Sequence, residues 1–249
     1  EYSNWRNKWV ELSEENRNKL VKHIKGFSQR PSFALILDAA GWNSVSLSET
    51  IGSITKQLYP HWVLHITNEN MSAPDLSEKI QALNDNRIKS STVPAPDTSD
   101  WVVELNPDTQ LHEAALFTAA VSINKNPEAA LLYSDHDHID PEGNFCDPYM
   151  KPDWNPDLFA EMNYLTPFVA FKQELWLNYR NEDSDPLPSL VEITKTLTHN
   201  EIFHIPHILA TIRVNGSGVH LQPTHKRVLH DLPEPTPAVS MLIPTKDKG

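Results

Sequence analysis

The chain has 249 residues, a length that suits one large α/β domain or one domain with additional segments. Its 33 acidic and 21 basic residues give a formal net charge of -12, which argues against nucleic acid or an anionic membrane surface as the main partner. The single cysteine, Cys146, excludes a disulfide within the chain and fits a reducing compartment.

Two further features of the sequence narrow the class of protein. No apolar run approaches the roughly 20 residues of a membrane-spanning helix, and no charged and then apolar leader opens the chain. The seven glycines form neither a Gly-x-Gly-x-x-Gly nor a P-loop pattern, so a glycine loop that cradles a nucleotide is excluded. We therefore expect a cytoplasmic domain, which could also be a piece of a longer protein. An anionic ligand would need a local attraction, such as a metal ion or a helix N-terminus.

The first hundred residues indicate a helical segment followed by βα repeats. Aromatic and aliphatic side chains among the charged residues of segment 1–30 predict a helical N-terminal appendage. Ser46 and Glu49 have the spacing of a capping box, which predicts a helix that begins at Ser46. Apolar runs predict strands at 32–37, 62–67 and 88–93, with helices between them. This alternation predicts a mostly parallel sheet covered by helices.

The stretch that follows places carboxylates after two apolar runs. The run 101–105 predicts a buried strand that ends before Asp108, and helical spacing predicts a helix over 111–123. A second apolar run, 129–133, predicts a strand that ends at Ser134-Asp135-His136-Asp137. Ligands of α/β sheets bind beyond the carboxyl ends of the strands, so we expect function around Asp108 and Asp135.

Regular elements become less evident after Asp140. Three prolines in 147–158 predict an ordered loop. The later predictions are a strand at 165–171, a helix at 174–179, an acidic loop at 181–188, a helix at 190–197 and a strand at 202–214. We therefore expect an α/β domain over 31–222, a proline-rich linker over 223–237, and the first strand of a second domain within 238–249.

Four segments carry motifs that point to one family. Residues 133–165 contain Tyr-Ser-Asp-His-Asp, Lys-Pro-Asp-Trp-x-Pro-Asp-Leu and Asn-Tyr in that order. Residues 53–62 have the pattern Ser-x-x-x-Gln-x-Tyr-x-x-Trp, 105–109 read Leu-Asn-Pro-Asp-Thr, and 204–206 read His-Ile-Pro. Together these segments resemble the family 2 glycosyltransferases of the GT-A fold, in particular the N-terminal transferase-like domain of tandem bacterial enzymes. Residues 239–249 are similar to the opening strand of a further transferase domain.

The resemblance assigns roles to individual residues. It implies a nucleotide-sugar donor, a UDP-sugar in particular, and a divalent Mg or Mn ion that stabilises the diphosphate leaving group. Asp108 matches the metal ligand of the Asp-x-Asp motif, and Asn106 replaces its first aspartate. The implied donor-binding residues are Asp38, Glu69, Asn106 and Asp108. Asp135 and Asp137 are implied to lie near a reacting sugar, and Asp185, beside Asp183, is the candidate catalytic base.

Three departures from the family pattern leave open the alternative that this domain is catalytically silent. His136 stands in place of a glutamate, Thr211 stands where the family has a histidine that can complete the metal site, and the catalytic-base segment is altered around Asp185.

Taken alone, Asp108 could be a turn or helix-cap residue, and Glu69 could be a solvated loop residue. A zinc or iron centre in Asp-His-Asp-His at 135–138 would need a turn, because alternate residues of a strand face opposite sides.

The sequence therefore predicts a metal-assisted, inverting glycosyltransferase that transfers a sugar from a nucleotide sugar to a glycan or polysaccharide. It would act in the cytoplasm, free or at the periphery of the inner membrane, with a downstream transferase domain of the same polypeptide as its partner. The alternative is a catalytically silent GT-A module that binds glycan or scaffolds an active downstream domain. A third hypothesis, an unrelated acidic α/β binding protein, requires the motif matches to be accidental.

Overall fold

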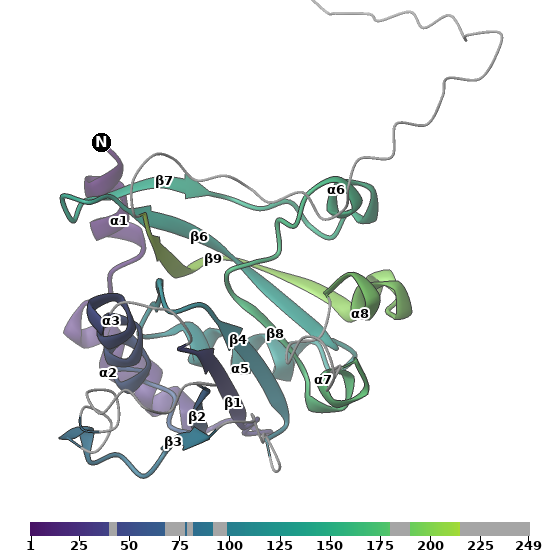
Figure 1. The fold of residues 1–249 in the computed structure, drawn as a ribbon, viewed down its shortest axis with the longest axis horizontal. Helices are drawn as coiled ribbons and strands as arrows, with labels where there is room; N and C mark the ends of the chain where they lie inside the picture. Colours follow the sequence, from purple (N-terminus) through teal and green to yellow (C-terminus); the bar gives the residue numbers. More distant parts are fainter. Residues whose placement is uncertain (40–43, 68–77, 79–81, 92–98, 180–189, 215–249) are drawn as a thin grey trace, which may run out of the picture.

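A computed structural model describes residues 1–39, 44–67, 78, 82–91, 99–179 and 190–214 (Figure 1). These residues form one curled, mixed sheet of nine strands that is covered by helices on both faces. The strands are β1 (Phe33–Asp38), β2 (Trp62–Thr67), β3 (Ile88–Ser91), β4 (Trp101–Leu105), β5 (Thr109–Leu111), β6 (Leu131–Ile139), β7 (Phe145–Tyr149), β8 (Val169–Lys172) and β9 (Ile202–Arg213). The predicted α/β fold class is therefore confirmed.

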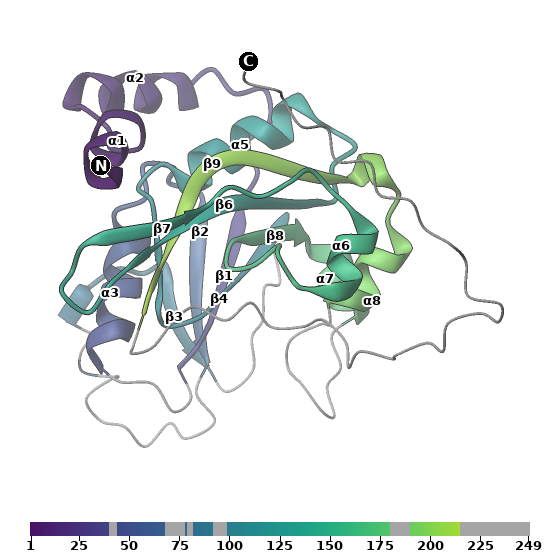
Figure 2. The ribbon, with the colours of Figure 1, turned by 90° about the horizontal axis from the view of Figure 1, so that it is seen from above.

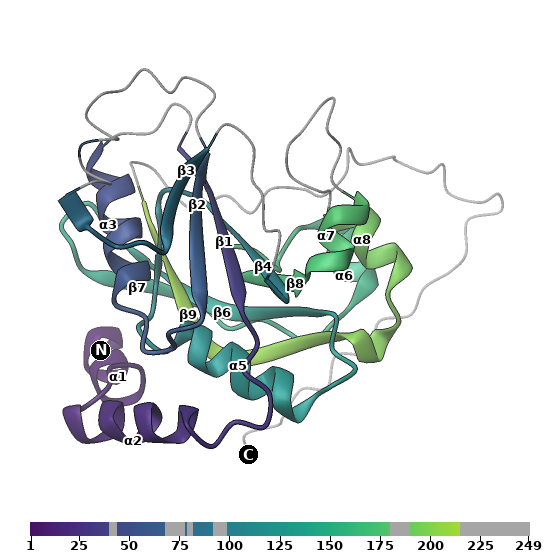
Figure 3. The ribbon, with the colours of Figure 1, turned by 90° about the horizontal axis from the view of Figure 1, so that it is seen from below.

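The order of the strands divides the sheet into two halves. The order is β3-β2-β1-β4-β8-β6-β9-β5, and β7 pairs with β6 outside this path. In the first half β3, β2, β1 and β4 are parallel (Figure 3). In the second half β8 runs antiparallel between β4 and β6, and β9 runs parallel to β6. The carboxyl ends of β1 and β4 consequently lie at one edge of the sheet.

Helices bury apolar side chains against both faces of the sheet. The helices are α1 (Tyr2–Trp9), α2 (Glu14–Ile24), α3 (Ser44–Thr55), α5 (Ala115–Lys125), α6 (Pro156–Glu161), α7 (Gln173–Tyr179), α8 (Leu190–Thr196) and a 3-10 turn, η1 (His199–Glu201). One apolar cluster joins the sheet to α2, α3 and α5, and a second joins it to α6, α7 and α8. Figure 2 shows α1, α2 and α5 gathered on the side of β9. Burial of these two clusters supplies the main driving force for folding.

Several predicted elements agree with the structure. The strands at 62–67 and 101–105 have the predicted bounds, and the helix at 190–197 differs by one residue at its end. Segment 1–30 contains two helices, separated by a break at which Ser13 accepts a hydrogen bond from the N–H of Asn16 as the cap of α2. The division of the chain into domains stays a prediction, and 215–249 lie outside the described residues.

Other predictions about the elements were wrong, mainly because distant residues supply the pairing. Leu111 belongs to β5, which pairs with β9, and not to the helix that follows. The strand predicted to end at 134–137 continues to Ile139, because β7 and β9 pair with it along this length. The loop predicted at 147–158 contains the end of β7 and the start of α6. The first of the predicted βα helices begins at Ser44 instead of Ser46.

The start of α6 had a visible local signal. The Asn155 side chain accepts a hydrogen bond from the N–H of Leu158 (2.9 Å), and Pro156 occupies the first helical position. An asparagine cap followed by proline is a typical helix start.

Candidate functional site

Two of the predicted site residues lie at the ends of neighbouring parallel strands: Asp38 is the last residue of β1, and Asn106 directly follows β4. Leu37 of β1 pairs with Leu105 of β4, so Asp38 and Asn106 come next at the same level of the sheet. Asp38 is half-buried, whereas Asn106 is exposed. The structure therefore brings both residues to adjacent strand ends, where α/β sheets bind their ligands.

Asp108 lies in the tight turn that joins β4 to β5. The N–H of Thr109 donates to the Asn106 carbonyl at 3.0 Å and closes the turn. Thr50 of α3 donates its hydroxyl to the Pro107 carbonyl at 2.8 Å and fixes the turn against the helix. The Thr109 N–H and the Thr50 hydroxyl therefore hold this turn in place without the Asp108 carboxylate.

The Asp108 carboxylate is half-buried, and burial raises its pKa above the usual range. The carboxylate makes a weak side-chain contact, with Oδ1 lying 3.5 Å from the Thr109 hydroxyl. No basic side chain forms an ion pair with it in the described part of the chain. A half-buried carboxylate without a cationic partner is a group that a bound cation would stabilise.

The described residues contain no group of three or more His, Cys, Asp or Glu side chains that could hold a metal ion. The alternative of a metal centre at 135–138 is therefore not found among them. Asp108 and Asn106 offer one carboxylate and one amide oxygen, which suit a hard cation such as Mg or Mn but leave most of its coordination to other oxygens. The metal-binding role of Asp108 stays a prediction.

Asp135 lies within β6 and is buried, with 3% of its surface exposed. Its Oδ1 accepts hydrogen bonds from the backbone N–H of Lys151 and from Nε2 of His204, both at 2.8 Å. The other ring nitrogen of His204 lies 3.2 Å from the exposed carboxylate of Asp153, and the His204 ring stacks on Tyr133. Asp135 thus joins β6 to β9 and to the segment after β7.

Asp137 is fully buried and bound on both carboxylate oxygens. Its Oδ2 accepts hydrogen bonds from the Tyr2 hydroxyl and from Nε of Arg6, each at 2.7 Å. Its Oδ1 accepts the hydroxyl of Thr211 at 2.6 Å. Two of these donors come from α1, so this carboxylate holds the N-terminal helix against the sheet.

Two buried histidines alternate with these aspartates along β6. The rings of His136 and His138 lie edge to face, with their centroids 5.1 Å apart. Nδ1 of His136 and Nε2 of His138 have no hydrogen-bond partner in the described part of the structure. Burial lowers the pKa of His136 to about 2, so its ring is neutral at physiological pH.

The structure does not bring all of the predicted site residues together. Asp38, Asn106 and Asp108 lie at the strand ends, whereas Asp135 and Asp137 are buried within β6. Glu69 and Asp185, with Asp183, lie outside the described residues. The catalytic roles given to these aspartates are therefore still predictions.

Sequence reasoning overlooked the partners of the β6 aspartates. Lys151 is buried, and its ammonium group donates to the carbonyls of Leu165 (2.8 Å) and Thr166 (2.9 Å). Arg6 is buried as well, although it belongs to a short helix rich in exposed side chains. The Lys-Pro-Asp-Trp motif at 151–154 was a signal for Lys151, but nothing local in the sequence distinguishes Arg6.

No protein-family model matches this chain. Among curated proteins it is 25% identical over 274 residues to the O-antigen biosynthesis protein RfbC of Myxococcus xanthus. This match covers 90% of the chain but 22% of the relative, so the chain spans less than a quarter of that protein.

Solved structures share the fold at low sequence identity. TarS residues 1–349 of S. aureus, in complex with UDP-GlcNAc, give a TM-score of 0.55 at 14% identity over 75% of this chain and 60% of that one. The mannosyltransferase PcManGT of Pyrobaculum calidifontis, in complex with GDP-Man and Mn2+, gives 0.51 at 12% identity over 84% and 63%. The chain therefore has a GT-A-like glycosyltransferase fold.

Proposed function

We propose that this chain is a glycosyltransferase domain that transfers a sugar from a nucleotide sugar to a glycan or polysaccharide acceptor. The main support is the position of Asp108, a half-buried carboxylate at the strand ends of a GT-A-like fold that has no cationic partner among the described residues. Similar structures hold UDP-GlcNAc and GDP-Man with Mn2+, and a curated relative acts in O-antigen biosynthesis.

In this proposal the nucleotide diphosphate lies across the ends of β1 and β4. Mg or Mn would be held by Asp108 and the Asn106 amide oxygen together with diphosphate oxygens, and would act as a Lewis acid on the leaving group. Asp38 and Glu69 contact the nucleoside. Asp185 deprotonates the acceptor hydroxyl, which attacks opposite the leaving group and inverts the anomeric carbon. A further transferase domain of the same polypeptide is the proposed partner.

A second candidate function is a silent GT-A module that scaffolds an active domain. The observation in its favour is that Asp135 and Asp137, which the resemblance places near the sugar, are almost fully buried and occupied by hydrogen bonds. Such residues stabilise the fold without contacting a substrate. A scaffold requires this stability and no contact with a sugar.

Titration calorimetry with UDP and with GDP, each with Mn, separates the two candidates. If the transferase proposal is right, one of the two nucleotides should give saturable heat with a dissociation constant below about 1 mM. UDP and GDP serve as probes because a nucleotide-sugar donor contains the same nucleoside diphosphate. Asp108→Ala should weaken this binding at least about tenfold, since it removes the single carboxylate of the turn.

The matched control is Asp157→Ala, which removes an exposed carboxylate from the first turn of α6. It should bind the nucleotide like the unmodified chain, and circular dichroism should show both variants folded. Absence of heat with both nucleotides would refute the transferase proposal and leave the scaffold. Equal loss in the two variants would show that Asp108 has no special role.

A further inference from the structure

The Lys-Pro-Asp-Trp segment 151–154, here called the strap, lies between β7 and α6 and is fastened to β6. The N–H of Lys151 donates to the Asp135 carboxylate at 2.8 Å, and the Tyr133 hydroxyl donates to the Pro152 carbonyl at 2.7 Å. On the strap both of these groups belong to the backbone, which carries no charge. The two links therefore hold the first half of the strap to the sheet without any titration of the strap itself.

A third link joins Asp153 of the strap to β9 through His204. Nδ1 of His204 lies 3.2 Å from the Asp153 carboxylate, and Nε2 lies 2.8 Å from the Asp135 carboxylate. An ionised carboxylate accepts hydrogen bonds but cannot donate one, so a ring that serves both carboxylates carries a proton on each nitrogen. The ring also stacks on Tyr133 with centroids 5.0 Å apart, which favours a cation. Both links therefore form only when His204 is an imidazolium.

The two carboxylates differ in what they lose when the ring gives up one proton. The side chain of Asp135 is 5% exposed, whereas that of Asp153 is 92% exposed. A buried carboxylate that loses a donor has no water to replace it, but an exposed carboxylate is solvated again. The single proton of the neutral ring should therefore stay on Nε2, and Nδ1 then turns a lone pair toward Asp153.

We propose that His204 is a pH-sensitive latch for the strap. As an imidazolium it holds Asp153, and as a neutral ring it keeps Asp135 and releases Asp153, because a lone pair and a carboxylate repel each other. The release loosens Trp154, which packs on Phe159 of α6 with centroids 5.3 Å apart. It also frees one wall of a cavity of about 560 Å³ that the latch and the strap line together. Histidine is the side chain that ordinarily changes its charge between pH 5 and 8, the range in which we expect the release.

Other titratable groups lie around the latch. On the strap, burial lowers the pKa of the Lys151 ammonium group to about 7, so this group titrates in the same range. On β6, burial raises the pKa of Tyr133, so its hydroxyl stays protonated. Lys125 at the end of α5, Glu128 after it and His199 of η1 line the same cavity. The experiment must therefore separate the histidine of the latch from Lys151 and from His199.

Hydrogen exchange followed by NMR in the whole chain tests the latch between pH 5 and 8. The reporters are the N–H of Asn155, which donates to the Tyr164 hydroxyl at 2.8 Å, and the N–H of Lys151 at the other end of the strap. As the ring resonances of His204 report the loss of a proton, the protection factor of Asn155 should fall about two- to five-fold, the range for a link to an exposed carboxylate. The protection factor of Lys151 should stay constant, because Asp135 keeps its partners.

Four variants assign the response to its group. Asp153→Asn should abolish the change at Asn155 while His204 still titrates, because an amide accepts from an imidazolium and donates to a neutral ring. His204→Gln, which cannot become charged, should abolish the change as well. Lys151→Met keeps its backbone N–H and should retain the change. His199→Gln, the matched control, removes another histidine of the same cavity and should also retain it.

An Asn155 protection factor that stays constant through the titration of the His204 ring would overturn the latch. Loss of the change in Lys151→Met would also overturn it, because the lysine is then the switch, and so would a change that persists in Asp153→Asn. Asp153 is exposed, so its variant should fold even if His204→Gln does not. None of these readouts uses Asp108 or a nucleotide, so the latch and the proposed transferase function fail separately.

Discussion

At the scale of single residues, Lys151 has an ammonium group that the fold removes from water. Its ammonium group is buried, donates to two carbonyls and lies near the Asp135 carboxylate. Burial lowers its pKa to about 7, and the negative charge of Asp135 only partly opposes this effect. The folded chain therefore binds this proton far more weakly than the unfolded chain does.

This difference predicts a pH dependence of stability. Between pH 7 and the ordinary lysine pKa the unfolded state holds more protons, so the free energy of unfolding rises with pH in this window. Relative to Lys151→Met, the unmodified chain should gain roughly 4 kcal/mol between about pH 7 and about pH 10 and show no difference in slope below pH 7. Urea unfolding across this range measures it.

Lys195→Met is the control for this experiment, because Lys195 is an exposed residue of α8 paired with Glu192. Its pH profile should follow that of the unmodified chain. If Lys151→Met also follows that profile, the ammonium group at 151 is not destabilised by burial.

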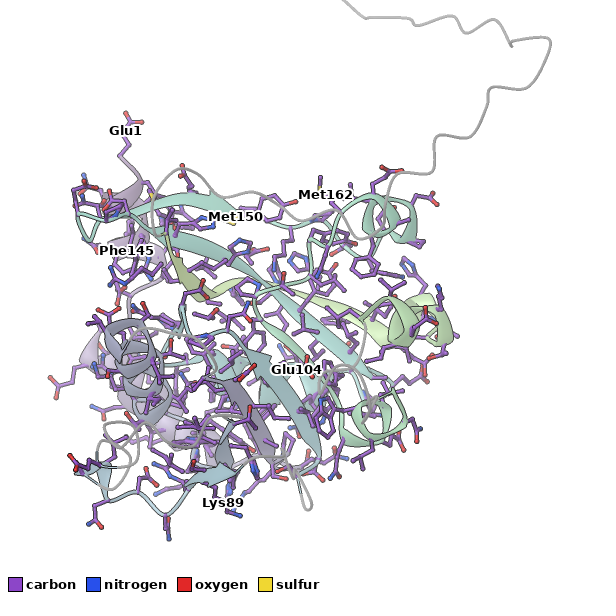
Figure 4. All side chains as sticks on the ribbon, in the orientation of Figure 1. Glu1, Lys89, Glu104, Phe145, Met150 and Met162 are labelled. Carbon is purple, nitrogen blue, oxygen red and sulfur yellow. The ribbon has the colours of Figure 1, made fainter. Side chains whose placement is uncertain are left out.

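At the scale of elements, α1 depends on one buried ion pair. Arg6 is bound to Asp137 and to Glu11, and its guanidinium lies 3.4 Å from the centroid of the Phe145 ring. Phe145, labelled in Figure 4, is the first residue of β7. The helix has eight residues, which is too short for stability on its own. Its place on the sheet therefore comes from these side-chain contacts.

Arg6→Ala should destabilise the chain by about 3–5 kcal/mol, because it leaves the Asp137 carboxylate buried without a cation. Urea unfolding measures the loss, and hydrogen exchange should show the amides of α1 losing protection before those of β6. Lys195→Ala, which breaks an exposed pair, should cost at most about 1 kcal/mol. A loss of similar size in both variants would contradict the anchoring role of Arg6.

The elements that could be predicted are those whose signal is local. The strands at 62–67 and 101–105 are short apolar runs with clear ends, and their bounds were predicted correctly. β5 and the second half of β6 could not be predicted, because β9 supplies their hydrogen bonds from about 75–100 residues away. Asp135 can occupy a strand there because its carboxylate is satisfied by Lys151 and by His204, which is 69 positions away in the sequence.

At the scale of the whole molecule, the sheet carries two kinds of polar residue with different roles. The ends of β1 and β4 hold carboxylates that the rule for α/β sheets predicts from sequence alone. The middle of β6 holds carboxylates that link α1, β9 and the segment after β7. The sequence predicts the first group as ligand-binding residues, but it cannot distinguish the second group from them without the tertiary contacts.

No helix among the described residues is long and apolar enough to cross a membrane. The edge of the sheet at Asp108 is the feature of this part of the chain that we propose to bind the nucleotide sugar.

The ion pair between Arg6 and Asp137 also imposes an order in time on a newly made chain. Arg6 precedes its partner by 131 positions, and Thr211, which completes the same carboxylate, follows Asp137 by 74. At ribosomal speed Arg6 emerges roughly 10 s before Asp137, and α1 has no docking surface during that interval. The helix α1 is therefore synthesised well before the strands against which it packs, and it joins the fold late.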